Sequence, residues 1–275
     1  MTETKYLFLD IDNTFYSGKS GQVPATAMEA VRLARANGSK VFLCTGRSRA
    51  EAMKYLDIDV DGFIFSSGSY CVAGNTVIYD HPISTELVNE IMGLIRRFEM
   101  GVLLGGLNHA YLDQKCYEDV KNYFSKPETD EETKRKDMRE NGMFEMEQRD
   151  PEDPVYKMGA SVSHGISFEP LREVLPHPFR LIQTLSSPEG DFGDISDGSI
   201  MKSDGIRRVL DWYGADFKDA VGIGDSENDL DMIQACGLGI AMGNGSDAVK
   251  QAANWVTSDI DDDGLLHAFE YAGVI

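Results

Sequence analysis

Residues 6–14 read Tyr6-Leu7-Phe8-Leu9-Asp10-Ile11-Asp12-Asn13-Thr14, a short apolar run followed by two carboxylates two positions apart. The apolar run is typical of a strand buried on both faces, as in a parallel sheet. Carboxylates this close together need a proton or a cation between them, and their oxygens suit Mg²⁺. One of them can act as a nucleophile and the other as a general acid and then base. A turn that only uses its aspartates as caps would have a similar pattern.

The sequence on either side of this run alternates between apolar strands and amphipathic helices. The expected elements before residue 66 are strands over 6–9, 41–44 and 63–65 and helices over 25–37 and 48–56. After residue 200 we expect helices over 202–212, 228–235, 248–252 and 265–272 and strands over 220–223, 238–242 and 255–257. Such alternation predicts an α/β fold with a Rossmann-like parallel-sheet core.

The middle of the chain has a different order of elements. It has a long helical pattern over 85–98, short strand patterns, and a charged stretch over 126–141 that we interpret as a solvated face or a loop. This order is α+β, so we predict an inserted domain over 83–189 and a parallel-sheet domain formed by 1–82 and 190–275.

Three further segments each lie just after a predicted strand, at the sheet edge where open α/β folds bind ligands. Thr45-Gly46 supplies a hydroxyl and a glycine amide, which suit a phosphate but also an ordinary helix cap. Lys202 opens a helix and can reach a phosphoryl oxygen, although an isolated lysine is more often a surface residue. Residues 222–229 place three acidic side chains in five positions, more than capping a helix requires.

Taken together and in this order, Asp10, Thr45-Gly46, Lys202 and Asp225-Asn228-Asp229 resemble the haloacid-dehalogenase-like (HAD) phosphohydrolase superfamily. The position of the insert resembles the large cap of the Cof-like branch, in which a loop like Gly243-Asn244-Gly245 also recurs. The family usually has glycine where this chain has Asn13, and asparagine tolerates a positive φ better than most residues. Where relatives often have Asn-Gly-Ala, this chain has Ser67-Gly68-Ser69.

The resemblance implies a role for each matching position. Asp10 would attack phosphorus and become an aspartyl-phosphate, and Asp12 would protonate the leaving oxygen and then activate water. Asp10 and Asp225 would bind Mg²⁺ through their side chains and Asp12 through its backbone carbonyl, with Asp229 supporting the waters of the metal. The groups that would contact the phosphoryl oxygens are Thr45, the amides of Ile11 and Gly46, Lys202 and Asn228.

These implications predict a Mg²⁺-dependent phosphatase for a small phosphate monoester such as a sugar phosphate, a nucleotide or a cofactor phosphate. A phosphomutase of the same superfamily would need the same two aspartates, and a phospho-receiver that is not an enzyme would need neither Asp12 nor a large insert. The sequence identifies neither the physiological substrate nor the oligomeric state.

The bulk composition excludes some partners. The 275 residues carry a formal net charge of −20, which disfavours nucleic acid and anionic membranes as partners. We find no membrane-spanning run and no signal peptide, and we interpret the four scattered cysteines as free thiols, so we expect a cytoplasmic protein.

Overall fold

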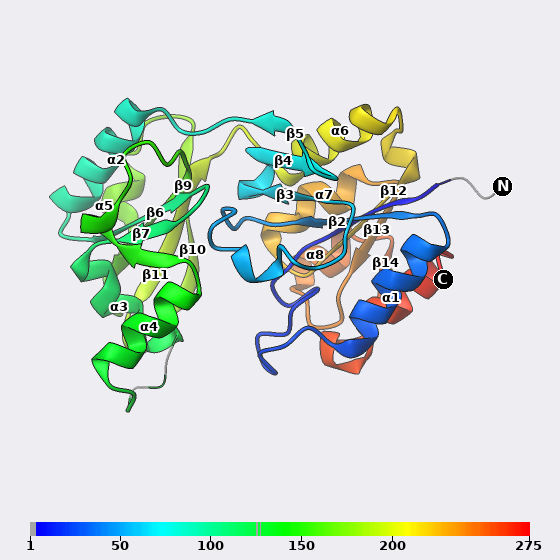
Figure 1. Ribbon diagram of the computed structural model, residues 1–275, viewed down its shortest axis with the longest axis horizontal. Coiled ribbons are helices and arrows are strands. Elements are labelled where there is room, and N and C mark those ends of the chain that lie inside the picture. The colour runs from blue at the N-terminus through cyan, green and yellow to red at the C-terminus, as the bar shows by residue number, and fades with distance from the viewer. Residues whose placement is uncertain (1–3, 125, 127) are drawn as a thin grey trace. The chain divides into compact units, whose positions relative to one another are not determined.

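The computed structural model describes residues 4–124, 126 and 128–275 (Figure 1). The chain divides into two compact units. We call Met1–Gly46, Ile58–Asp80 and Ile200–Ile275 the first unit, and Arg47–Asp57 with His81–Ser199 the second unit. Among the residues that the structure describes, no helix is long and apolar enough to cross a membrane.

The first unit is built on an eight-stranded sheet with the order β14-β13-β12-β1-β2-β3-β4-β5. Its strands are β1 (Tyr6–Leu9), β2 (Lys40–Cys44), β3 (Gly62–Phe65), β4 (Tyr70–Ala73), β5 (Thr76–Asp80), β12 (Ala220–Gly224), β13 (Leu238–Ala241) and β14 (Trp255–Val256). The strands from β14 to β3 run parallel, and β4 and β5 are antiparallel. Leu9 pairs with Leu43 of β2 and with Ile223 of β12, so the three strands end side by side.

Helices cover this sheet. They are α1 (Ala25–Ala36), α6 (Lys202–Tyr213), α7 (Leu230–Ala235), α8 (Asp247–Ala252) and α9 (Gly264–Tyr271). Ile206 of α6 and Met232 of α7 belong to one buried cluster with Phe8 and Phe42 of the sheet. The helices α1 and α9 lie side by side (Figure 1). Because helices cover this sheet, β1 and β2 are apolar apart from Lys40 at the start of β2, and this apolar pattern predicted them.

The second unit has a six-stranded sheet with the order β10-β11-β9-β6-β7-β8, antiparallel except for β7 and β8. Its strands are β6 (Gly101–Gly106), β7 (Ala110–Leu112), β8 (Met143–Glu145), β9 (Val155–Val162), β10 (Phe179–Ser186) and β11 (Asp191–Asp197). Its helices are α2 (Thr85–Arg97), α3 (Gln114–Phe124), α4 (Glu131–Glu140) and α5 (Glu169–Arg172). Leu104 packs in a cluster with α2, and its neighbour Leu103 packs in a cluster with α3 and α4, because successive strand residues face opposite ways.

The α/β class and the parallel-rich core are confirmed, but one predicted element is wrong. Residues 48–56 form no α-helix, only a 3₁₀ turn at Met53–Tyr55, because local helical spacing is a weak signal that tertiary packing can override. The charged stretch contains helix α4, whose first turn is capped by Asp130 and whose Met138 is buried. Most of its other side chains are exposed, which agrees with the predicted solvated face.

The predicted boundaries of the insert also differ from those of the second unit. The predicted boundary at residue 190 falls before β11, which pairs with β9 and β10, so the second unit continues to Ser199. Residues 47–57 belong to this unit as well: Ala50 is buried in the cluster around α3, and its N–H donates to the carbonyl of Gly106. Phe192 and Ile195 are the only large apolar residues of β11, so neither an apolar run nor a regular alternation marks the strand.

Candidate active site

Three loops of the first unit begin where β1, β2 and β12 end. Asp10 follows β1, Thr45 follows β2, and Asp225 follows β12, and all three residues are buried. The backbone holds them in register: the Asp10 N–H donates to the carbonyl of Ile223 at 3.0 Å, and the Thr45 N–H donates to that of Ile64 at 2.8 Å. The parallel register therefore brings predicted site residues that are far apart in sequence to one edge of the sheet.

Lys202 is the first residue of α6, and its side chain is 0% exposed. Its Nζ donates to Asp10 Oδ1 and to Asp229 Oδ1, both at 2.5 Å. Burial opposes the charged form of this amine, but the two carboxylates outweigh it and raise the pKa of Lys202 well above its usual value. The lysine is thus a buried ammonium fixed against the predicted nucleophile.

Three buried carboxylates gather beside this ammonium. Asp10, Asp225 and Asp229 each offer an oxygen, and these oxygens lie within 4.8 Å of one another. Asp229 Oδ2 accepts the N–H groups of Asp225 and Ser226, both at 3.0 Å, and its other oxygen faces Lys202. Both oxygens of Asp229 are therefore engaged, one by Lys202 and the other by the backbone of the Asp225 loop.

Burial and crowding change the acidity of two of these groups. Burial raises the pKa of Asp10 well above its ordinary value, and the charges of Asp229, Asp12 and Asp225 add to this while Lys202 opposes it. Burial and the charge of Asp229 likewise raise the pKa of Asp225 to about 7. These carboxylate oxygens are crowded together with too little positive charge nearby to neutralise them. Such a group of hard oxygen ligands suits a divalent cation such as Mg²⁺.

The Thr45-Gly46 loop lies next to Asn228. A Cβ atom added to Gly46 would lie 3.8 Å from Asn228 Nδ2 and 3.6 Å from Ser67 Oγ. Ser67 donates its N–H to the Thr45 carbonyl at 2.9 Å. The structure therefore brings the predicted phosphoryl-binding residues of two motifs together, and it adds Ser67, to which we had assigned no role.

The turn after Asp10 contains the other predicted residues. Ile11 is fully buried, and its carbonyl accepts the N–H groups of Phe15 and Tyr16 at 3.0 and 2.8 Å. Asp12 is partly exposed, and its charge contributes to the raised pKa of both Asp10 and Asp225. Asn13 has a φ of +58°, a left-handed conformation that asparagine tolerates better than most residues.

Sequence reasoning missed Thr14. Its Oγ1 donates to Asp225 Oδ1 at 3.0 Å in a buried contact between residues 211 positions apart. This bond opposes the rise in the pKa of Asp225 and fixes the orientation of its carboxylate. No local pattern marked this residue, because Thr14 stands among other polar residues after β1.

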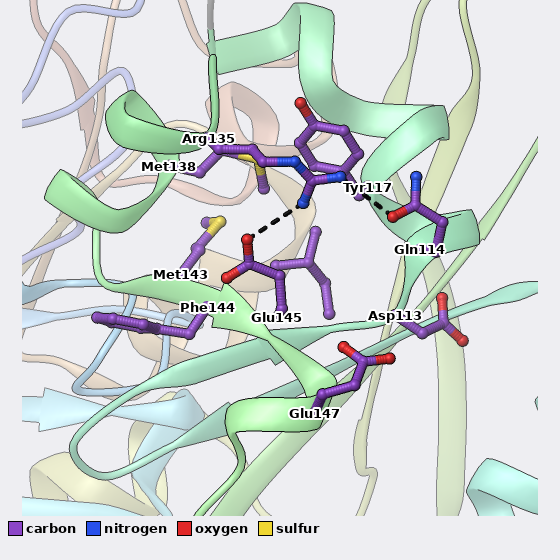
Figure 2. Close-up of a pocket in the computed structure, with 10 residues that line it drawn as sticks. Asp113, Gln114, Tyr117, Arg135, Met138, Met143, Phe144, Glu145 and Glu147 are labelled. Atoms are coloured by element: carbon purple, nitrogen blue, oxygen red, sulfur yellow. Dashed lines mark hydrogen bonds and ion pairs between the residues drawn. The ribbon is translucent and has the colours of Figure 1, made fainter. Parts of the chain in front are cut away.

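A cavity lies in each of the two units. One, of about 250 Å³, lies beside Asp225 in the first unit and is lined by Asn13, Ser17, Lys19, Asp225, Asn244, Asp259, Ile260 and Asp261. The other, in the second unit, measures only about 20 Å³, room for roughly one water (Figure 2). There the Arg135 guanidinium lies over the ring of Tyr117 and donates to Glu145 and Gln114. We therefore place the candidate active site in the first unit.

Residues 7–269 match the family of haloacid dehalogenase-like hydrolases. The chain belongs to this family. The pyridoxal phosphate phosphatase YbhA of Escherichia coli (strain K12) is 25% identical to it over 287 residues, which cover 99% of each protein.

Two solved phosphatase structures resemble this chain over nearly its whole length. The subclass IIB sugar phosphatase BT4131 is 26% identical with a TM-score of 0.75, over 99% of this chain and 100% of that one. The phosphatase BT1666 from Bacteroides thetaiotaomicron is also 26% identical with a TM-score of 0.77, over 99% and 96% of the two chains. The chain is a HAD-like phosphatase of the Cof-like type.

Proposed function

We propose that this phosphatase hydrolyses a small phosphate monoester in a Mg²⁺-dependent reaction, through an aspartyl-phosphate on Asp10. The observation that supports this most strongly is the ammonium of Lys202, buried between Asp10 and Asp229 with the Asp225 carboxylate close by. One ammonium among three buried carboxylates leaves excess negative charge, which is costly in a site built only for stability. A divalent cation would neutralise it.

Asp10 and Asp225 would hold the ion through their carboxylates and Asp12 through its carbonyl. Thr14 and Asp229 would keep these ligands in place through the bonds described above. When bound, Mg²⁺ neutralises charge on the phosphoryl oxygens. Phosphoryl transfer depends mainly on such positioning and charge stabilisation.

In the first step, a carboxylate oxygen of Asp10 attacks phosphorus and the bond from phosphorus to the ester oxygen breaks. Asp12 gives its proton to the departing oxygen, which leaves as an alcohol. Lys202 neutralises charge on the phosphoryl group, and Thr45 Oγ1, the amides of Ile11 and Gly46, and Asn228 hold its other oxygens. Asp10 is then an acyl phosphate.

In the second step, Asp12 takes a proton from water, and the water oxygen attacks phosphorus. The bond between phosphorus and Asp10 breaks, which frees inorganic phosphate and restores the carboxylate of Asp10. Asp12 is again protonated, so the cycle is balanced.

For the substrate, we propose a soluble phosphorylated metabolite rather than a nucleic acid, because a net charge of −20 repels a polyanion. We propose that the second unit acts as the cap and selects the substrate. In support, Arg47 directly follows Gly46 of the phosphoryl-binding loop and is the first residue of the second unit. The relatives named for a sugar phosphate and for pyridoxal phosphate make both classes first choices for a screen.

The test is phosphate release from p-nitrophenyl phosphate and from a metabolite panel, with Mg²⁺ or with EDTA. We expect turnover only with Mg²⁺ and none from Asp10→Asn. Asp211→Asn, which changes an exposed carboxylate on α6, is the matched control and should retain activity. Turnover by Asp10→Asn or in EDTA would refute the mechanism, and transfer to a sugar phosphate instead of water would indicate the phosphomutase.

A further inference from the structure

Asn244, in the loop after β13, contacts the turn that carries Asp12 and the loop that precedes α9. The side-chain Nδ2 of Asn244 donates to the carbonyl of Asn13 at 2.8 Å, and its Oδ1 accepts the N–H of Ile260 at 2.9 Å. A carbonyl needs a donor and an N–H needs an acceptor, so these partners fix the orientation of the amide. Asn244 thus joins the turn after Asp12 to the loop that precedes α9.

The turn that Asn244 contacts has an unfavourable backbone conformation. Asn13 follows Asp12 directly and has a φ of +58°, which non-glycine residues adopt at an energetic cost. Further hydrogen bonds hold it: its N–H donates to Tyr16 at 2.7 Å, and its Oδ1 accepts the N–H of Gly18 at 3.2 Å. The bond from Asn244 fixes the carbonyl of the same residue.

The same loop also holds the backbone of Asp225. The Ser246 N–H donates to the Asp225 carbonyl at 2.9 Å. A Cβ atom on Gly245 would lie 2.9 Å from that carbonyl oxygen, so a glycine is needed for this close approach. Residues 243–246 therefore connect the loop of Asp12 with the loop of Asp225.

We propose that Asn244 is a positioning residue that sets the Asp12 turn relative to Asp225 and thereby preorganises the Mg²⁺ site. This inference rests on the proposed function, in which Asp12 and Asp225 bind the ion. A purely structural role would differ: Asn244 would only attach the loop at Ile260, and the Asp12 turn would not depend on it.

Hydrogen exchange separates these two roles without relying on activity. Asn244→Ala removes both bonds, whereas Asn244→Asp keeps the acceptor for Ile260 and loses the donor to Asn13. Asn254→Ala is the matched control, because Asn254 Oδ1 accepts the Gly239 N–H at 2.7 Å elsewhere in the same unit. We expect faster exchange over residues 12–18 in both Asn244 variants and wild-type exchange there in Asn254→Ala. Wild-type exchange of this turn in Asn244→Asp would overturn the proposal.

Calorimetric Mg²⁺ titration of the metal-free proteins is the second readout. Partners that orient metal ligands typically contribute 10–100-fold to affinity, so we expect Asn244→Ala to bind Mg²⁺ about 10-fold more weakly than Asn254→Ala does. Equal affinities of these two variants would overturn the proposal. A wild type that neither binds Mg²⁺ nor hydrolyses any ester would instead refute the proposed function, and the exchange result would still decide whether Asn244 positions the turn.

Discussion

Lys202 is one buried ammonium that contacts two carboxylates, and its removal should leave Asp10 Oδ1 and Asp229 Oδ1 without their positive partner. Removing one partner of a buried ion pair typically costs about 3–5 kcal/mol. We expect Lys202→Met to lower the free energy of unfolding by about this amount in urea titrations and to abolish turnover. Lys218→Met changes an exposed lysine and should stay within about 0.5 kcal/mol of wild type. If Lys202→Met lost as little unfolding free energy as Lys218→Met, the buried ion pairs of Lys202 would be contradicted.

The stabilisation of the fold by Mg²⁺ should depend on pH because of Asp225. Its pKa in the folded metal-free protein is about 7, above the value of about 3.9 expected in the unfolded chain. Between these values the folded state binds more protons, so this group lowers stability as pH rises from about 4 to 7. Mg²⁺ needs the ionised carboxylate, so the rise in Tm caused by Mg²⁺ should be larger at pH 8 than at pH 5. Thermal unfolding with Mg²⁺ and with EDTA would check this, and an equal rise at both pH values would argue against Asp225 as a ligand.

Several individual site residues could be predicted from the sequence because each sits in a local pattern. Asp10 and Thr45 directly follow apolar strands, and Asp225 and Asp229 stand out as an acidic cluster. Thr14 could not be predicted to contact Asp225, because that bond depends on the parallel pairing of β1 with β12. A contact that depends on tertiary structure leaves no characteristic residue spacing in the sequence.

Helix α6 approaches the sheet closely at Gly205, three positions after Lys202. A Cβ atom there would lie 2.5 Å from Ile64 Cγ2 and 3.0 Å from the Cα of Gly68. We expect Gly205→Ala to move the helix and its lysine, lower kcat, and destabilise the protein by about 1–3 kcal/mol despite alanine's better helix propensity.

Gly93 in α2 is the matched control, because nothing lies within 4 Å of the Cβ it would gain. Gly93→Ala should stabilise the protein by about 0.5–1 kcal/mol. Unfolding and kinetic measurements on both variants would check the pair. If Gly205→Ala also stabilised the protein and kept full activity, the close packing of α6 would be wrong.

At the level of elements, the sequence predicted the parallel strands and the helices of the first unit, but not its antiparallel strands β4 and β5 or several elements of the second unit. Strand β11 has only two large apolar residues, Phe192 and Ile195, among Asp, Gly and Ser, so no apolar run marks it. Helix α4 is almost entirely charged, and its Arg135 lies 4.1 Å from the ring centroid of Tyr117. Such elements are stabilised by neighbours distant in sequence, which local propensity does not report.

The whole molecule carries a formal net charge of −20, and its proposed substrate is an anion. Long-range repulsion should slow their encounter at low ionic strength, and salt should relieve it, since the Debye length falls from about 30 Å at 0.01 M to about 8 Å at 0.15 M. We expect kcat/KM for an anionic monoester to rise with NaCl at constant free Mg²⁺. A steady fall with salt would show that local positive potential at the site governs encounter instead.

For the whole chain, the sequence predicted two regions of different architecture but not their limits. Residues 47–57 join the second unit through Ala50 and Glu51, whose Oε2 lies 3.6 Å from the buried Lys157 Nζ. Nothing local marks these residues as part of an insert that resumes at residue 81. A unit formed from separate stretches becomes visible only through its packing.

The central claim is that phosphate is carried by the carboxylate of Asp10, and covalent trapping tests it most directly. The protein is quenched during turnover of a phosphate monoester with Mg²⁺, treated with borohydride to reduce any acyl phosphate, and digested for mass spectrometry. We predict that Asp10 is reduced to homoserine only when substrate and Mg²⁺ are both present, and that Asp12 and Asp225 stay unmodified. Reduction at another residue, or none at Asp10 while phosphate is being released, would contradict the account.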